Sequence, residues 1–315
     1  MDREFVHVPV LAGEVVDLFA PVPAGLLVDA TVGGGGHAEA VLAANPNLRV
    51  VGIDRDPRAV AAAAGRLRPF GARAVVVRAR FDALGDLVRL HGAGAASGVL
   101  FDLGVSSPQL DEPGRGFSYR FEGPLDMRMD PGDLRSAADI VNAAPEAELA
   151  RLFAANGERR FARRLARSVV VARPLRTTTD LTDAVRRALP AAVLRQRGHP
   201  ARRVFQALRI AVNDELGVLA AALDQAVDIL VPGGRVAVIA YHSGEDRLVK
   251  AMFADAVSGG CVCPPDLPCV CGAVPRGRLV FRGARRPAPE EVERNRRAES
   301  ARLRVLERTG FPERR

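Results

Sequence analysis

The stretch LLVDATVGGGGHAEAVL, residues 26–42, holds an acid, four consecutive glycines and a histidine. Asp29 directly follows an apolar run, and a helical pattern follows the glycines. Glycines at such a strand-to-helix turn let the backbone approach a ligand closely, as they do around a dinucleotide pyrophosphate. Gly33-x-Gly35-x-x-Ala38 satisfies the dinucleotide fingerprint in its loose form, and a purely structural tight turn is the alternative. No Gly-Lys-Ser/Thr follows, so a phosphate-binding P-loop is excluded.

Further polar and aromatic residues stand after the next apolar runs. Asp54 comes roughly 20 residues after the glycines, where an acid accepts hydrogen bonds from ribose hydroxyls. Phe81 follows the third run, where a ring covers an adenine, and Asp102 ends the fourth. Ribose, adenine and glycine backbone describe a nucleoside ligand. An acid beside the first turn repels pyrophosphate but suits the cationic methionine end of S-adenosylmethionine (SAM), so SAM fits better than NAD.

The fourth apolar run leads into DLGVSSPQL, a short polar segment that contains a proline. Methyltransferases that act on exocyclic amino groups carry Asp/Asn/Ser-Pro-Pro-aromatic here, and Ser107-Pro108-Gln109 is a loose version of it. The lone pair of such an amine is delocalised into its ring. Acceptors that hold the amine protons, with a carbonyl opposite, localise that lone pair toward the methyl group. Transfer then depends on positioning the amine in line with the sulfonium, and no covalent nucleophile is needed.

The elements that position these residues alternate between strand and helix over the first hundred residues. Apolar runs that alternate with helical patterns predict a parallel sheet covered on both faces. The expected strands lie in residues 25–30, 48–54, 72–81, 97–104 and 235–243, with the last two in 277–283 and 300–310.

The pattern changes after about Val105, and no convincing apolar strand occurs before Gly198. Two loop-like pieces are followed by amphipathic helices. One helical pattern places Phe161, Leu165 and Val169 on one face, at i, i+4 and i+8. Its other faces carry five arginines: Arg159, Arg160, Arg163, Arg164 and Arg167. These arginines form either a solvated face or a surface that tracks phosphates.

We therefore predict an α/β fold in which a mainly helical domain is inserted into a sheet domain. The expected sheet domain spans 1–112 and 199–315, and the insertion, which we expect to recognise the substrate, spans 113–198. After the insertion, residues 203–231 show the pattern of one long helix that ends before Pro232.

The chain has 315 residues and a formal net charge of +8. This basic balance fits a polyanionic partner, most often nucleic acid. Lys250 is the only lysine, so the many arginines also fit a GC-rich coding bias. The sequence has no run of about 18 apolar residues and no basic start followed by an apolar segment, which predicts a cytoplasmic protein without a membrane span or secretory signal.

All four cysteines lie in CVCPPDLPCVC, at Cys261, Cys263, Cys269 and Cys271. Clustered cysteines in a cytosolic protein favour a metal site over disulfides, and four thiolates are a ligand set for structural zinc. Such zinc sites more often use Cys-x-x-Cys, so a reduced, thiol-rich loop is the alternative.

Together these motifs resemble the ribosomal RNA small subunit methyltransferase H family, SAM-dependent methyltransferases of the N4 amine of a 16S rRNA cytosine. DLGVSSPQLD at 102–111 and PLDMRMD at 124–130 carry the resemblance most specifically. It extends over nearly the whole chain, through HVPVL, DATVGGGGH, GIDRDP, RGFS, GERRFA, HPARRVFQALRI, PGGR, YHSGEDR and NRRAESARLR. Gly244 replaces the leucine that the family has in YHSGEDR, and GERRFA lacks the family's usual second acid.

The resemblance implies a Rossmann-like class I SAM methyltransferase sheet, with a cytidine in the decoding region of the small ribosomal subunit as target. The SAM contacts that it implies come from Gly34, Gly35, Gly36, His37, Asp54, Phe81, Asp102 and Gln109. The candidate residues on the catalytic side are Asp102, Ser107, Pro108, Asp126 and His242. We interpret His242 as a substrate-side group. For Asp126, a loop-fixing role in an ion pair with Arg128 or Arg135 is an equally strong alternative.

Two other function classes stay open from the sequence. A nicotinamide-dependent oxidoreductase agrees with the loose glycine fingerprint, but it leaves the motif after the fourth strand unexplained. A non-catalytic RNA-binding protein on a degenerate methyltransferase fold is disfavoured because Asp29, Asp54 and Asp102 all stand at strand ends. The sequence also leaves a homodimer open.

Overall fold

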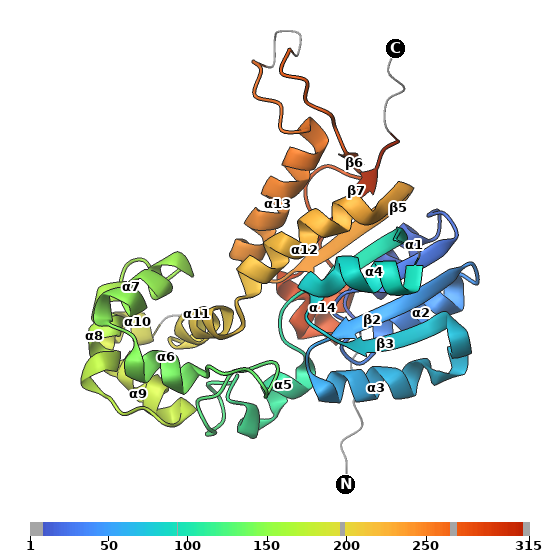
Figure 1. The fold of residues 1–315 in the computed structure, drawn as a ribbon. Helices are drawn as coiled ribbons and strands as arrows, with labels where there is room; N and C mark the ends of the chain where they lie inside the picture. Colours follow the sequence, from blue (N-terminus) through green and yellow to red (C-terminus); the bar gives the residue numbers. More distant parts are fainter. Residues whose placement is uncertain (1–8, 93, 196–198, 265–269, 311–315) are drawn as a thin grey trace. The chain divides into compact units, whose positions relative to one another are not determined.

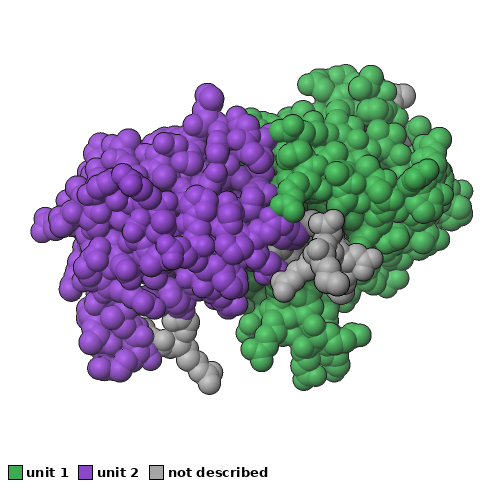
Figure 2. Space-filling view, turned by 90° about the horizontal axis from the view of Figure 1, so that it is seen from below, with its two compact units in different colours: residues 1–104, 216–315 green, residues 105–215 purple. Residues whose placement is uncertain are grey.

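The computed structural model describes residues 9–92, 94–195, 199–264 and 270–310. The chain forms two compact units, residues 1–104 with 216–315 and residues 105–215, which Figure 2 colours separately. Among the described residues, no helix is both long enough and apolar enough to cross a bilayer.

The first unit contains a seven-stranded sheet in the order β3-β2-β1-β4-β5-β7-β6 (Figure 1). The first five strands of this order are parallel, whereas β7 pairs antiparallel with both β5 and β6. The strands are β1 (Gly25–Asp29), β2 (Leu48–Asp54), β3 (Ala74–Arg78), β4 (Ala96–Asp102), β5 (Leu230–Ala240), β6 (Gly277–Leu279) and β7 (Arg302–Arg308). The predicted Rossmann-like α/β sheet is confirmed.

Helices cover both faces of this sheet because alternate residues of the buried strands point to opposite sides. Val99 and Phe101 of β4 join a core with α4 (Leu84–Gly92), α12 (Glu215–Ile229) and α13 (Ser243–Ser258). Leu100 of the same strand joins the opposite core, with α1 (Ala12–Phe19), α2 (Gly36–Ala44) and α3 (Pro57–Leu67). Shorter elements of this unit are η1 (Arg68–Arg73), η2 (Phe81–Ala83), α14 (Pro289–Arg294) and η4 (Arg296–Ser300).

The second unit is helical around its own core. Its elements are α5 (Ser107–Asp111), η3 (Pro113–Arg115), α6 (Ala137–Ala143), α7 (Glu146–Ala155), α8 (Ala162–Val171), α9 (Thr178–Ala188), α10 (Ala191–Leu194) and α11 (Arg202–Asn213). Leu165 and Val169 of α8 are buried in that core, and Phe161 packs against it. The five arginines in and before α8 are exposed, so the amphipathic prediction is confirmed.

The single long helix expected over 203–231 is wrong. Asp214 adopts a left-handed conformation, with φ 47°, and separates α11 from α12. Val204 and Phe205 of α11 are buried in the helical core, which places this helix in the second unit. The observed boundaries, at 104/105 and 215/216, therefore differ from the expected 112/113 and 198/199.

Candidate active site

The strand ends of the first unit bring the predicted acids to one edge of the sheet. From β1 the chain continues outward through β2 and β3, and it then returns to β4 on the other side of β1. Open α/β sheets bind ligands outside the carboxyl ends of the strands at such a switch point. Asp29 ends β1 and Asp102 ends β4, so both acids stand at this point.

Asp102 is held from several sides. The Tyr241 hydroxyl donates to Asp102 Oδ1 over 2.7 Å, and the Asp102 amide donates to Thr31 Oγ1 over 2.6 Å. The other oxygen, Oδ2, lies 3.7 Å from His37 Nδ1. Burial and the adjacent Asp102 carboxylate raise the pKa of Tyr241 well above its ordinary value. The phenol therefore stays protonated and acts as a donor that fixes the Asp102 carboxylate.

Asp29 is almost fully buried, with 1% of its surface exposed. Its Oδ1 accepts a hydrogen bond from the Thr31 amide over 3.3 Å, whereas its Oδ2 has no hydrogen-bond partner in the described parts of the chain. Burial raises its pKa to about 7; His37 and the Thr31 amide oppose this shift, and Asp102 and Asp54 add to it. A buried carboxyl oxygen without a partner is costly, so this position favours a cationic or hydrogen-donating ligand group.

Asp54 ties the glycine turn to the end of β2. Its Oδ2 accepts from the Gly33 amide over 3.0 Å, and its Oδ1 accepts from the Asp56 amide over 2.9 Å. Burial raises the pKa of Asp54 to about 6, although the hydrogen bonds from these amides oppose the shift. Asp54 is thus a second acid beside the turn, partly buried, in the position from which an acid binds ribose hydroxyls.

The backbone conformation and packing of the glycine turn require a glycine at position 35. Gly35 has φ 82°, and a Cβ there would lie 3.3 Å from Ala63 Cα of α3. Gly36 begins α2, directly before His37. His37 is buried, and its Nε2 lies 2.8 Å from the Val10 carbonyl oxygen. The turn is therefore a rigid, closely packed part of the fold.

Phe81 begins η2 after β3 and stays partly exposed. Its ring meets Phe101 of β4 edge to face, with ring centroids 5.7 Å apart and planes at 85°. This contact fixes the ring near the carboxyl edge of the sheet, as its predicted role against an adenine requires.

The Ser107-Pro108-Gln109 segment forms α5 in the second unit. The side chain of Ser107 lies outside the described part of the structure. Gln109 is buried, and its Oε1 accepts from the Ser106 amide over 3.1 Å. Gln109 therefore helps to hold the start of its own short helix, which is a contact that sequence reasoning missed.

Asp126 is paired with Arg128 through two hydrogen bonds of 2.8 Å, from Nε to Oδ1 and from NH2 to Oδ2. Burial by itself raises the pKa of Asp126, but the hydrogen bonds from Arg128 outweigh it, and the pKa is lowered. Both carboxylate oxygens are thus occupied, as the loop-fixing alternative expects with Arg128 as partner.

His242 caps the start of α13. Its Nδ1 accepts from the amides of Gly244 and Glu245 over 3.1 and 3.3 Å. In return, the buried Glu245 carboxylate accepts from the amides of Tyr241 and His242 over 2.8 and 3.1 Å. His242 Nε2 lies 3.1 Å from Glu245 Oε1 without hydrogen-bond geometry. His242 therefore caps this helix, a structural role that sequence reasoning missed.

Thr31 and Tyr241 were not among the predicted site residues, although both contact Asp102. A usable signal was present, because each lies within two residues of the end of an apolar strand, β1 or β5. Polar side chains at neighbouring strand ends of a parallel sheet meet at the same edge.

Comparison with known proteins gives one consistent result. The profile of the MraW methylase family matches residues 4–309. Proteins named "Ribosomal RNA small subunit methyltransferase H" are 48% identical over 310 residues in Heliobacterium modesticaldum and 49% identical over 312 residues in Carboxydothermus hydrogenoformans. These alignments cover 96% and 98% of this chain and 99% of each relative. The chain therefore belongs to the MraW methylase family.

Proposed function

We propose that this protein transfers the methyl group of SAM to the exocyclic N4 amine of a cytidine in the decoding region of 16S rRNA. Membership of the MraW methylase family, with relatives named as small-subunit rRNA methyltransferases, is the observation that carries the proposal. The finer assignment to N4 of cytidine is supported by the Ser107-Pro108-Gln109 segment, which follows β4 as in amine methyltransferases.

The acids at the strand ends fit SAM as the methyl donor. SAM carries a sulfonium and an ammonium group, and the unpartnered Asp29 Oδ2 is an acceptor suited to a cation. Asp54 is suited to the ribose hydroxyls and Phe81 to the adenine, in agreement with their places at the sheet edge. The remaining proposed contacts come from Gly34, Gly35, Gly36, His37, Asp102 and Gln109. When bound, SAM supplies an electrophilic methyl group.

The Ser107-Pro108-Gln109 segment is our candidate for the part of the chain that holds the target amine. Acceptors of the Ser107-Pro108-Gln109 segment would hold its protons and direct the nitrogen lone pair toward the methyl group that SAM would supply. The nitrogen then releases a proton. The contacts of Asp126 and His242 support positioning roles for these two residues.

The exposed arginines of α8 support a polyanionic substrate. Arg163 and Arg164 have no ion-pair partner in the described ranges, whereas Arg167 lies 3.6 Å from Glu146. Arginine donates two parallel hydrogen bonds to a phosphate, so a surface with unpaired arginines suits the rRNA backbone.

Incubation with small ribosomal subunits that lack the modification, in the presence of SAM with a labelled methyl group, tests this function. We expect label in 16S rRNA and N4-methylcytidine after digestion to nucleosides. Labelling that persists when the target cytidine is replaced would refute the proposed position.

Thermal stabilisation by S-adenosylhomocysteine but not by NADH separates a methyltransferase from a nicotinamide enzyme, because only a ligand of the native state raises the melting temperature.

A further inference from the structure

The loop between α13 and β6 carries the cysteine cluster, at the end of α13 away from the candidate active site. Helix α13 begins beside His242 and has 16 residues, so it extends about 24 Å to Ser258. The methyl-transfer proposal uses none of the residues in this loop, so the cysteines call for a separate explanation.

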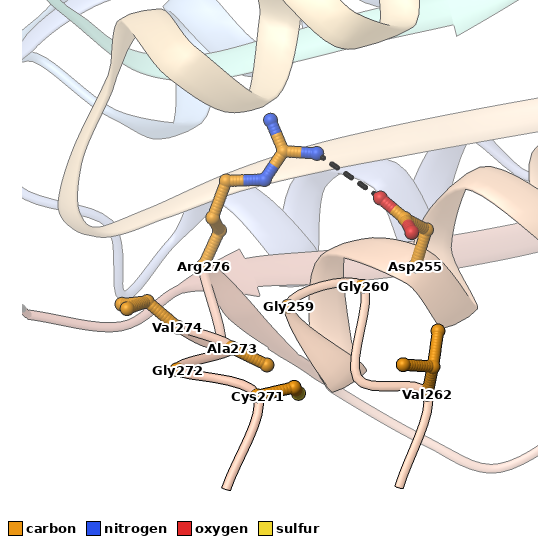
Figure 3. Close-up of a pocket in the computed structure, with 9 residues that line it drawn as sticks. All are labelled: Asp255, Gly259, Gly260, Val262, Cys271, Gly272, Ala273, Val274 and Arg276. Atoms are coloured by element: carbon orange, nitrogen blue, oxygen red, sulfur yellow. Dashed lines mark ion pairs between the residues drawn. The ribbon is translucent and has the colours of Figure 1, made fainter.

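Both ends of the loop are fixed to the fold. Gly259 ends α13 with φ 65°, and the Arg276 amide donates to the Ala256 carbonyl oxygen over 2.8 Å. The Arg276 guanidinium lies 3.3 Å from Asp224 and 3.0 Å from Asp228, both on α12. It also forms an ion pair with Asp255 of α13, which Figure 3 marks with a dashed line. The two limbs of the loop therefore leave a rigid base side by side.

The sulfur atoms of three cysteines converge between these limbs. Cys261 and Cys263 lie on the outgoing limb and Cys271 on the returning limb, and their sulfurs all lie within 4.8 Å of one another. The Cys261 and Cys271 sulfurs are 3.7 Å apart and do not form a disulfide. Two thiolates bound to one tetrahedral zinc ion at about 2.3 Å lie about 3.8 Å apart. The observed spacing therefore agrees with two ligands of one ion.

The valines next to the cysteines are largely exposed. Val262 and Val270 are 86% and 88% exposed, whereas Cys261 and Cys263 are partly buried and Cys271 is exposed. The Val270 amide donates to Cys263 Sγ over 3.4 Å, a contact that stabilises a thiolate. Val262 also lines the pocket between the limbs together with Cys271, but because both valines are so exposed, they bury little apolar surface that could hold the loop together.

We propose that Cys261, Cys263 and Cys271 bind one zinc ion that joins the two limbs of this loop. Thiolate ligands, a filled d shell without geometric preference and the observed sulfur spacing agree with zinc. Cys269, the fourth cysteine of the sequence prediction, lies outside the described residues and is not part of this proposal. Structural zinc is four-coordinate, so a fourth ligand completes the site beside these three thiolates. We assign the zinc a structural role because the site is remote from the proposed methyl transfer.

The test measures metal in the full-length protein purified with reductant and without chelator. We expect about one zinc per chain, and background zinc in the double variant Cys261→Ser/Cys271→Ser. The matched control Val262→Ser/Val270→Ser places the same side chain on the same limbs and keeps its zinc. Zinc at the wild-type level in the cysteine variant, or background zinc in the wild type, overturns the proposal.

Two further measurements do not depend on the folding of a variant. After zinc is removed from the wild type with a chelator, titration with Co²⁺ is expected to produce thiolate-to-cobalt absorption that saturates at one ion per chain. Denaturation without reductant is expected to release all four cysteines as thiols. A missing cobalt spectrum, or the conversion of two thiols to a disulfide, contradicts the proposal even if methyl transfer is normal.

Discussion

The Tyr241 hydroxyl donates to Asp102 Oδ1 over 2.7 Å and thereby joins the ends of β5 and β4. These two strands are neighbours in the parallel part of the sheet. The bond orients the Asp102 carboxylate so that its second oxygen faces His37. Tyr241, at the end of β5, therefore sets the orientation of Asp102, which stands at the switch point of the sheet.

Replacing Tyr241→Phe is expected to weaken binding of S-adenosylhomocysteine by roughly fivefold to thirtyfold, because it removes a hydrogen bond to a charged group worth about 1–2 kcal/mol. Calorimetric titration measures the affinity. Tyr119→Phe in the second unit, which removes the hydroxyl of the only other tyrosine, is the control and is expected to leave the affinity unchanged. Equal losses in both variants would contradict a specific role for Tyr241.

The ligand-free protein is expected to lose stability as the pH rises. The pKa of Asp29 is raised to about 7 in the folded state, so between about pH 4 and 7 the folded state binds more protons than the unfolded state. The cost at pH 8 is up to about 4 kcal/mol for the shift from 3.8. The variant Asp29→Asn removes this cost. Its melting temperature is therefore expected to exceed that of the wild type at pH 8 but not at pH 4.

Binding of SAM is expected to release a proton from Asp29. A cationic ligand lowers the pKa of a nearby acid, so the affinity for SAM relative to S-adenosylhomocysteine, which lacks the sulfonium charge, rises from pH 5 to pH 8. Calorimetry in buffers of different ionisation enthalpy measures the proton released. Asp29→Asn is expected to flatten the pH dependence of the ratio; an unchanged dependence in this variant would assign the effect to another group.

Gly35→Ala is expected to destabilise the first unit by about 1–2 kcal/mol, because alanine disfavours a left-handed conformation. The new Cβ also lies 3.3 Å from Ala63 Cα. Urea denaturation measures the free energy of unfolding. The control Gly13→Ala is in α1, where a Cβ meets nothing within 4 Å, and it is expected to stabilise by about 0.5–1 kcal/mol.

The arginines of α8 are expected to contribute to the salt dependence of rRNA binding. Changing Arg163 and Arg164 to glutamine reduces the slope of log K against log salt by about 0.7–0.9 for each phosphate that the protein no longer neutralises. Arg89→Gln on α4, where the arginine is already paired with Asp86, is the control. A slope that stays the same in the double variant means that α8 presents only a solvated face.

The sequence predicts the sheet well because β1, β2 and β4 are largely apolar runs, and each ends at an aspartate: Asp29, Asp54 or Asp102. The sequence does not reveal the helix break at Asp214, because no residue there signals it. Asp214 follows helical residues without a glycine or proline, and the φ of 47° follows from the packing of α11 and α12 in different cores.

Side-chain caps are also hard to predict. His242 and Glu245 satisfy one another's backbone donors, whereas the usual capping signal is serine, threonine or aspartate. The sequence offers both Arg128 and Arg135 as ion-pair partners of Asp126, and only the folded loop shows that Arg128 is the partner.

The place of β7 between β5 and β6 sets an order of events during synthesis of the chain. Residues 105–215 leave the ribosome as one continuous segment and form their own core, so this unit is able to fold early. The β5 edge keeps unpaired backbone groups until Arg302–Arg308 have been made. An exposed edge strand is a site of aggregation, so a nascent chain stalled before β7 is expected to be the vulnerable species.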